Sequence, residues 1–429
     1  MKQLRVNGRY FEQDGKPFFW LADTAWLIYA NITEEEAYVY LKNRADKGFN
    51  VIQTVLVYSV DALRDINKMP ILLEDVRSEE YWAHCDRVIR MAGELGLYMA
   101  LVPCWGSLVM HDVLTMENAG RYAQFLAERY GTYDNVIWLL GGDINAAGHE
   151  EIYRLMGRIL KGKCPHQLIG FHPFGRCAST LWFADDDGED AWLDFHLFQS
   201  GHRRYDQCNM GAWDDVTGED TGLFGEDNWK FVLHDRNRSR KPTMDGEPSY
   251  EWILQGLHDP SQPYWHAIDV RRYAYWSAFA GAAGHTYGDC SIIMFFDPET
   301  MKDGRLYGAR EHWRMAMHHD GSGQMRYLKE LLLSVDYRAG RAADELVIGG
   351  QREKHERIAV LAGPDFALAY SFLGKEFELD TSAYIGKDIY FMRPSTGVYS
   401  YLGKVDGPRF HYEPVPCYDG NEDVVIVIR

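Results

Sequence analysis

Continuous apolar runs alternate with amphipathic segments along most of the chain. Residues 50–57 (NVIQTVLV) are apolar and β-branched almost throughout, which is typical of a parallel strand covered on both faces. Residues 79–95 instead place Trp82, Cys85 and Ile89 at helical spacing. The alternation continues to about residue 335, so the pattern predicts repeated strand–helix units.

Eight strands can be followed in order. They are predicted at residues 18–22, 50–57, 98–103, 136–140, 168–171, 193–198, 242–244 and 282–285. Helices are predicted at residues 32–48, 79–95, 117–130, 150–160, 227–237, 266–280 and 324–335. Because polar or aromatic residues follow each strand, we predict an α/β fold of the (β/α)8 TIM barrel type rather than a doubly wound sheet.

Short β-type runs flank the predicted barrel. Asn7-Gly8 and Asp14-Gly15 are two-residue hairpin signals, so a small β lid is expected before the first barrel strand. Beyond about Tyr337, strands are predicted at residues 358–361, 366–372, 389–392 and 424–428, separated by Gly, Pro and Asp. We therefore predict a barrel domain at residues 1–336 and, packed on it, a small C-terminal antiparallel β-sandwich at residues 337–429.

Composition narrows the function classes. The chain has 429 residues and a formal net charge of -18, which opposes binding to nucleic acid or to an anionic membrane surface. The first residues, MKQLRVNGRYF, lack the apolar core of a secretory signal, so a cytoplasmic enzyme is expected, or a secreted or periplasmic one if a signal was trimmed. Seven scattered cysteines form no C-x-x-C pair, so reduced packing cysteines are expected, with no metal and no cofactor. The oligomeric state stays open.

Two carboxylates stand where predicted strands open into loops. Glu247 lies between Gly246 and Pro248. Pro248 biases the backbone of Glu247 towards an extended conformation, which restricts the direction of its side chain. Asp143 follows Gly141-Gly142 at the end of the fourth strand. Hydrolysis of a glycosidic bond requires such a carboxyl pair. Asp245, two residues before Glu247, is expected to be a structural hydrogen-bond acceptor on the same side of the strand.

The positions of the two carboxylates predict the stereochemistry. Strands four and seven end at the same narrow mouth of an eight-stranded barrel. Direct attack by a carboxylate requires carboxyl groups about 5 to 5.5 Å apart, whereas inversion requires about 6.5 to 9.5 Å. We therefore expect a retaining, two-step mechanism.

Several motifs in register resemble a known family. The runs FFWLADTAW, RADKGFNVIQ, GGDIN, FQSGH, DGEPSYE and RRYAYWSAFAGAAGHTYG occur in this order. Together they resemble the apiosidase-like domain family, which includes glycoside hydrolase family 140 and belongs with the clan A barrels. The C-terminal domain is similar to a small collagen-binding-type domain found there, to which we attach no collagen function.

The resemblance implies roles for individual residues. It implies Asp143 as acid/base and Glu247 as nucleophile, acting on pectic oligosaccharides, including apiose-containing ones. The residues implied around the sugar are Asp23, Trp26, Gln199, His202, His285 and Tyr287. Further candidates for sugar contacts are Trp105, His172 and Tyr250. After Tyr287-Gly288 the chain reads DCSIIMFF, where the family pattern would have His or Asn and a Trp-Gln pair.

Two rival functions remain. A metal-dependent amidohydrolase-like barrel could use His172, His202 and Asp289, which follow strands five, six and eight. Against this, the first strand ends in LADTAW without a His-x-His pair. A non-catalytic carbohydrate-binding barrel would be expected to have lost one of the two carboxylates.

Overall fold

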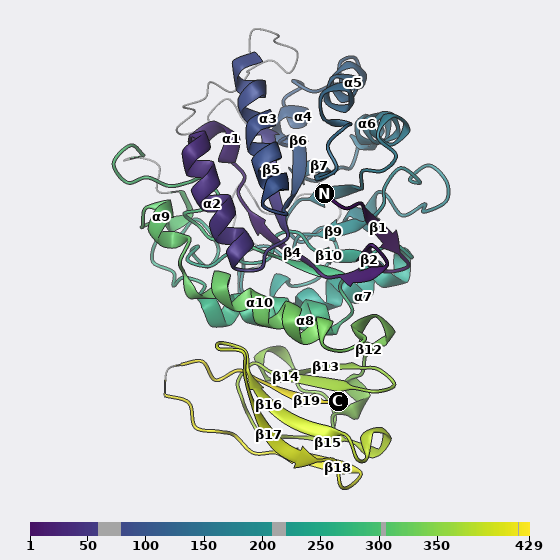
Figure 1. Cartoon of the computed structure of the whole chain (residues 1–429), viewed down its shortest axis with the longest axis vertical. Helices are drawn as coiled ribbons and strands as arrows, with labels where there is room; N and C mark the ends of the chain where they lie inside the picture. Colours follow the sequence, from purple (N-terminus) through teal and green to yellow (C-terminus); the bar gives the residue numbers. More distant parts are fainter. Residues whose placement is uncertain (59–78, 208–219, 302–305, 419) are drawn as a thin grey trace.

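Eight parallel strands form the central sheet of the computed structural model, which describes residues 1–58, 79–207, 220–301, 306–418 and 420–429 (Figure 1). Their order is β8-β7-β6-β5-β4-β11-β10-β9. The bounds are β4 Trp20–Thr24, β5 Val51–Val57, β6 Tyr98–Cys104, β7 Val136–Ile144, β8 Ile169–Pro173, β9 His196–Phe198, β10 Thr243–Asp245 and β11 Gly284–Tyr287. All eight predicted barrel strands are present.

The sheet closes between β8 and β9, where no continuous ladder forms. The backbone N–H of Asp194 donates to the carbonyl of Ile169 at 2.7 Å at one end of this seam. At the other end the N–H of Gln199 donates to the carbonyl of Cys177 at 3.0 Å. The sheet is therefore a nearly closed barrel, and the predicted TIM-barrel fold is confirmed.

Helices cover the outer face of the barrel, and each predicted helix is present. The long ones are α2 Glu34–Asp46, α3 Glu79–Glu94, α5 Ala119–Tyr130, α6 Glu150–Lys163, α7 Asn228–Arg238, α8 Ala267–Phe279 and α10 Asp320–Leu333. The single-turn helices are α1 Ile28–Asn31, α4 Ser107–Met110 and α9 Trp313–Ala316. Thr33 begins α2 with a capping box to Glu36, as its sequence suggests.

A three-stranded sheet closes the amino-terminal end of the barrel. It comprises β1 Leu4–Asn7, β2 Tyr10–Gln13 and β3 Lys16–Phe18, joined by two hairpins. The ring of Phe11 packs 5.6 Å from Trp20 and 5.5 Å from Phe195, where β4 begins and just before β9. The expected β lid thus covers the end of the barrel opposite the carboxyl-terminal strand ends.

The C-terminal region is antiparallel, as predicted. A six-stranded sheet has the order β12-β13-β14-β19-β16-β17, and β15 pairs with β18. The bounds are β12 Arg341–Ala342, β13 Ile358–Ala362, β14 Ala367–Ser371, β15 Phe377–Asp380, β16 Asp388–Arg393, β17 Val398–Lys404, β18 Arg409–Tyr412 and β19 Val424–Ile428. The sequence analysis predicted β13, β14, β16 and β19 but not β12, β15, β17 or β18. The side chains of β17 are nearly all exposed and so lack a buried alternation.

Helix α8 lies between the barrel and the C-terminal sheet (Figure 1). All its residues from Val270 to Phe279 are buried. Tyr275 of α8 stacks on Tyr370 of β14 with ring centroids 4.7 Å apart. The C-terminal sheet therefore packs directly on the barrel helices, while the boundary between residues 336 and 337 stays a prediction.

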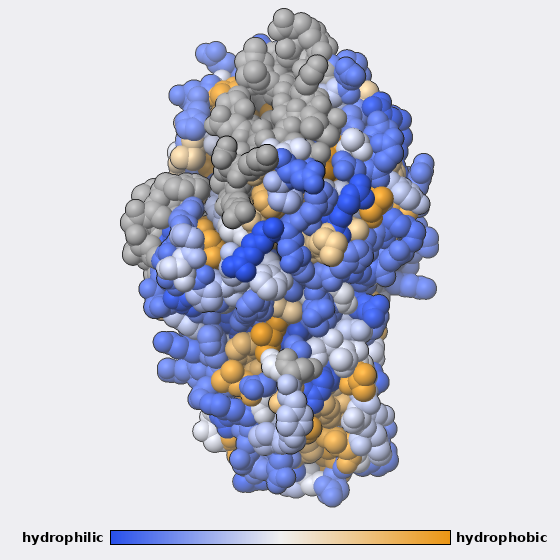
Figure 2. All heavy atoms as spheres, turned by 90° about the vertical axis from the view of Figure 1, so that its left-hand side faces the viewer, coloured by the Kyte–Doolittle hydropathy of each residue, from blue (hydrophilic) through white to orange (hydrophobic). Residues whose placement is uncertain are grey.

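The described surface in the view of Figure 2 is largely hydrophilic, and apolar residues gather in its lower, C-terminal part. The described helices are too short or too polar to span a lipid bilayer. Five of the six described cysteines are buried, as expected of packing side chains, and Cys208 lies outside the described residues.

Candidate active site

Glu247 follows β10 at the carboxyl-terminal end of the barrel and is almost completely buried, with 7% of its surface exposed. Two histidines approach its carboxylate, His172 from β8 and His202 from the loop after β9. His202 Nε2 lies 3.0 Å from Oε1, and His172 Nε2 lies 3.3 Å from Oε2. The sequence placed both histidines at strand ends, and the structure shows that they meet at Glu247.

These contacts set the charge of Glu247. Burial by itself opposes the charged form, but the interactions of the carboxylate with His172 and His202 more than offset the effect of burial. Together they lower the pKa of Glu247 to about 2. Glu247 is therefore a carboxylate throughout the neutral range.

Asp143 lies near the end of β7 in an unusual backbone conformation. Gly141, Gly142 and Asp143 have φ values of 95°, 96° and 54°, and the pairing of β7 with β8 shifts register between Gly141 and Ile144. The left-handed region is uncommon for a residue with a side chain, although aspartate tolerates it better than most. This bulge turns the half-buried Asp143 out of the regular strand.

His172 connects Asp143 with Glu247. Its Nδ1 accepts the backbone N–H of Asp143 at 3.3 Å, and its Nε2 faces Glu247. One fully buried imidazole thus contacts the segments that carry both proposed catalytic residues.

Tyr58, which the sequence reasoning did not single out, belongs to the same site. Burial and the charges of Asp143 and Glu247 raise the pKa of its hydroxyl above the ordinary value. Its ring centroid lies 5.2 Å from that of Trp105. The available signal was its position directly after an apolar barrel strand.

Aromatic rings surround the carboxylates. The ring of Trp26 lies 5.2 Å from Trp105 and 5.2 Å from His172, edge to face with both. The ring of Tyr250 lies 4.7 Å from His202. Burial and the charge of Glu247 raise the pKa of the Tyr250 hydroxyl. Five expected sugar-binding residues are therefore brought together: Trp26, Trp105, His172, His202 and Tyr250.

Gln199 lies one residue beyond β9. The preceding Phe198 stacks on Phe231 of α7, outside the barrel, so side-chain alternation directs Gln199 towards the interior. Gln199 is 4% exposed, and its Oε1 accepts no hydrogen bond from the described residues. It is therefore placed to contact a ligand at the barrel mouth.

Asp23, His285 and Tyr287 lie on the helix-facing side of β4 and β11. Asp23 forms a buried ion pair with Arg44 of α2 and accepts the hydroxyl of Tyr40. Tyr287 donates its hydroxyl to Glu251 at 2.5 Å. Burial lowers the pKa of His285 to about 3. The structure does not bring these three residues to Glu247.

Asp245 also faces the helices. Its carboxylate accepts the hydroxyl of Ser200 at 2.6 Å and the amide of Asn228 of α7 at 3.1 Å. Burial raises its pKa to about 6. It is a structural acceptor, as expected, but it faces α7 and so does not share the side of the barrel on which Glu247 lies.

The residues of the metal-hydrolase alternative do not converge. His172 and His202 contact Glu247. Asp289 instead accepts a hydrogen bond from Nδ1 of His319 at 2.6 Å. Across the part of the chain that the structure describes, no three His, Cys, Asp or Glu side chains are grouped to hold a metal ion.

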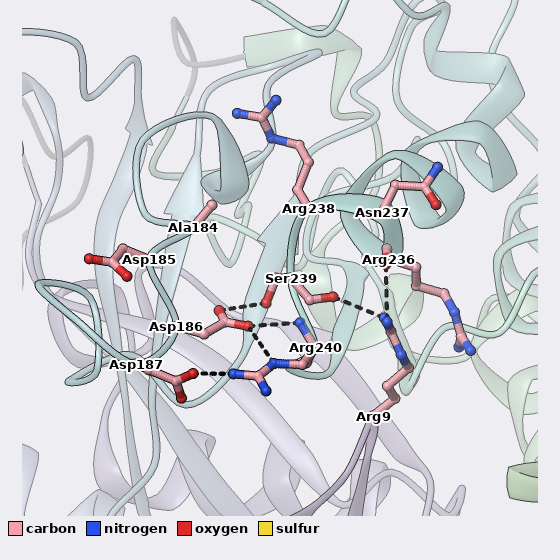
Figure 3. A pocket seen from close by; sticks show the side chains of 10 residues that line it. All are labelled: Arg9, Ala184, Asp185, Asp186, Asp187, Arg236, Asn237, Arg238, Ser239 and Arg240. Atoms are coloured by element: carbon pink, nitrogen blue, oxygen red, sulfur yellow. Dashed lines mark hydrogen bonds and ion pairs between the residues drawn. The ribbon is translucent and has the colours of Figure 1, made fainter.

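A surface hollow of about 320 Å³ lies at the other end of the barrel, between residues 184–187 and the end of α7 (Figure 3). Neighbouring carbonyls and carboxylates bind its arginines. Arg9 donates to the carbonyls of Ser239 and Arg236 at 3.0 Å each, and Arg240 pairs with Asp187. Since the hollow contains neither proposed catalytic carboxylate, we assign it no role in the chemistry.

Known proteins resemble the chain in both sequence and structure. A solved structure described as a glycoside hydrolase is 35% identical and has a TM-score of 0.88; the match covers 100% of this chain and 96% of that one. A glycoside hydrolase family 5 structure from Bacteroides vulgatus is 33% identical with a TM-score of 0.88, covering 99% of this chain and 93% of that one. No curated protein matches. The model of the family described as apiosidase-like, catalytic domain, matches residues 5–339, so the chain belongs to this family, as its motifs suggested.

Proposed function

We propose that the chain is a glycoside hydrolase that cleaves glycosidic bonds in pectic oligosaccharides, including apiose-containing ones, with retention of configuration. The observation that carries the proposal is the buried Glu247, which two histidines keep as a carboxylate beside the segment that presents Asp143. Membership of the apiosidase-like family and the glycoside hydrolase relatives support the reaction class.

In this mechanism Glu247 attacks the anomeric carbon and forms a glycosyl–enzyme ester. Asp143 protonates the leaving oxygen and afterwards removes a proton from the water that hydrolyses the ester. The low pKa of Glu247 suits a nucleophile that must be ionised before it reacts.

The proposed sugar-binding residues are Trp26, Trp105, Gln199, His202 and Tyr250. Aromatic rings present flat apolar surfaces on which the C–H faces of a sugar can pack, and the polar groups bind its hydroxyls. His172 contacts Glu247 and the backbone of Asp143, so we assign it to positioning them. Asp23, His285 and Tyr287 are left out because they face the helices.

Two measurements test this function. Hydrolysis of a panel of 4-nitrophenyl glycosides and pectic oligosaccharides should identify a substrate without added metal, and a chelator should not reduce the rate. Proton NMR of the first product, recorded before mutarotation, should show the configuration of the substrate. An inverted product would refute the retaining mechanism, and chelator-sensitive turnover would favour the amidohydrolase-like alternative.

A further inference from the structure

Gln53 lies inside the barrel, in the middle of β5, and is fully buried. Its Nε2 donates to the carbonyl of Gly246 at 3.0 Å and lies 2.9 Å from the Thr286 hydroxyl, to which it also donates. The identity of the nitrogen follows from chemistry, because a carbonyl oxygen can only accept a hydrogen bond. One side chain of β5 therefore reaches across the barrel to the residue directly before Glu247.

The Gly246 carbonyl lies where the strand ladder has ended. Strand β10 has three residues and pairs with β11 at a single register position, Asp245↔His285. On its other side, towards β9, the chain is held by backbone bonds from the Gly246 N–H to Phe198 and from the Gly201 N–H to Glu247. A buried carbonyl requires a hydrogen-bond partner, and Gln53 supplies it where β11 does not.

We propose that Gln53 is a positioning residue for the reaction: its amide fixes the Gly246–Glu247 peptide and so directs the Glu247 carboxylate at His202 and at the anomeric carbon. In this role the Gln53 side chain acts on Glu247 through its hydrogen bond to the Gly246 carbonyl. A displaced carboxylate loses its alignment with the reacting carbon. A misplacement of about 1 Å can reduce the rate about 100-fold.

The proposal rests on the proposed function, so the wild-type protein and Glu247→Gln are measured first on the best aryl glycoside of the panel. The principal variant is Gln53→Met, which keeps the length of the side chain and removes its donor. We expect kcat to fall about 10- to 100-fold with KM within about twofold, because substrate binding is unchanged while attack is misaligned.

Thr54→Val is the matched control. Thr54 is the next residue of β5, equally buried, and donates outward to the hydroxyl of Tyr29 at 3.3 Å. The Thr54→Val variant loses a buried hydrogen bond of the same strand but leaves the contact with Gly246 intact, so its kcat should stay near that of the wild type. Equal kcat values for Gln53→Met and Thr54→Val would overturn the positioning role.

Gln53→Glu provides a second test, the pH dependence of kcat. This test remains available if Gln53→Met fails to fold. A protonated carboxyl group can donate to the Gly246 carbonyl, whereas the ionised one repels it. The ratio of its kcat to that of the wild type should therefore fall as pH rises, and a ratio independent of pH would overturn the proposal.

A crystal structure of Gln53→Met, or of Gln53→Glu at high pH, separates this inference from the proposed function. We expect the separation of His202 Nε2 and Glu247 Oε1, now 3.0 Å, to exceed hydrogen-bonding distance. An unchanged separation contradicts the positioning role whatever the enzyme acts on. Undiminished turnover by Glu247→Gln would contradict the proposed function instead.

Discussion

The two oxygens of Glu247 face different histidines, His172 on β8 and His202 in the loop after β9. The Glu247→Gln variant keeps the shape of this side chain and removes the attacking charge. We expect turnover to be abolished while the thermal unfolding temperature changes little. Measured turnover near the wild-type rate would show that Glu247 is not the nucleophile.

His172 and His202 together keep Glu247 ionised against the effect of burial, and His202 forms the hydrogen bond to Oε1. The His202→Phe variant removes the hydrogen bond and leaves a ring beside Tyr250, so the pKa of Glu247 should rise. Because the active form is the carboxylate, activity is present above this pKa and lost as pH falls through it. The acidic limb of the kcat/KM profile should therefore move to higher pH.

His84→Phe is the control for this experiment. His84 is a buried imidazole 3.9 Å from Glu34, on α3 and outside the barrel. The His84→Phe variant should leave the acidic limb of the kcat/KM profile unchanged. An unchanged limb in His202→Phe as well would show that His202 does not set the pKa of Glu247.

Asp143 is expected to act through its proton. An aryl oxide departs without protonation, whereas a sugar alkoxide does not, so Asp143→Ala should retain far more activity on 4-nitrophenyl glycosides than on natural substrates. Comparison of kcat/KM for the two substrate classes tests this. Equal losses on both would indicate a structural role for Asp143.

At the scale of single elements, the β7 bulge is the feature that positions Asp143. A Cβ at Gly141 would lie 2.4 Å from the carbonyl oxygen of His172, at a φ of 95°. We expect Gly141→Ala to lower both stability and activity, because neither β7 nor β8 can relax without moving Asp143 or His172. Thermal unfolding and kcat measure the two effects.

Gly148 provides the matched control, since its φ is 83° and an added Cβ would meet nothing within 4 Å. Gly148→Ala should cost about 1 kcal/mol of backbone strain and leave kcat unchanged. If Gly141→Ala behaved in the same way, close packing at the bulge would not be important for the site.

The same bulge shows where the sequence was informative and where it was not. Residues 136–140 read as a buried strand, and the observed β7 continues to Ile144 because its pairing with β8 resumes beyond the glycines. The ends of strands could be predicted, and with them the positions of Glu247, Asp143 and the two histidines. The side to which each residue points could not, because barrel strands are apolar on both faces. Asp23 and Tyr287, which pair in register across β4 and β11, therefore looked like mouth residues although both face the helices.

At the scale of the whole molecule, polar contacts with buried members join the barrel to the C-terminal region. Glu226 lies just before α7, and its carboxylate is 2.9 Å from Nη2 of Arg272 of α8. The same carboxylate accepts a hydrogen bond from Nε2 of His355 at 2.7 Å. These partners are separated by up to 129 residues, so no local pattern in the sequence predicts them. Unfolding experiments measure whether the barrel and the C-terminal region unfold together or separately. We expect a single transition, since α8 is buried between the two parts.

Arg271 and Asp423 form the most completely buried of these pairs, both at 0% exposure of the side chain. Nε and Nη2 of Arg271 each donate to the Asp423 carboxylate at 2.8 Å. Arg271→Met would leave Asp423 buried without its cation, which typically costs about 3–5 kcal/mol of the free energy of unfolding. Denaturant unfolding should show this loss in one shared transition.

Two further variants decide whether the loss comes from an unpaired charge. Arg271→Met with Asp423→Leu removes both charges, and we expect it to recover much of the stability, since replacing a buried ion pair by apolar side chains is often neutral. Arg341→Met removes an exposed partner of Glu345 and should change the free energy of unfolding by less than about 0.5 kcal/mol. If the double variant were no more stable than Arg271→Met, the loss would reflect packing around α8. Two separate transitions in the wild type would mean that the buried pair holds together domains that fold independently.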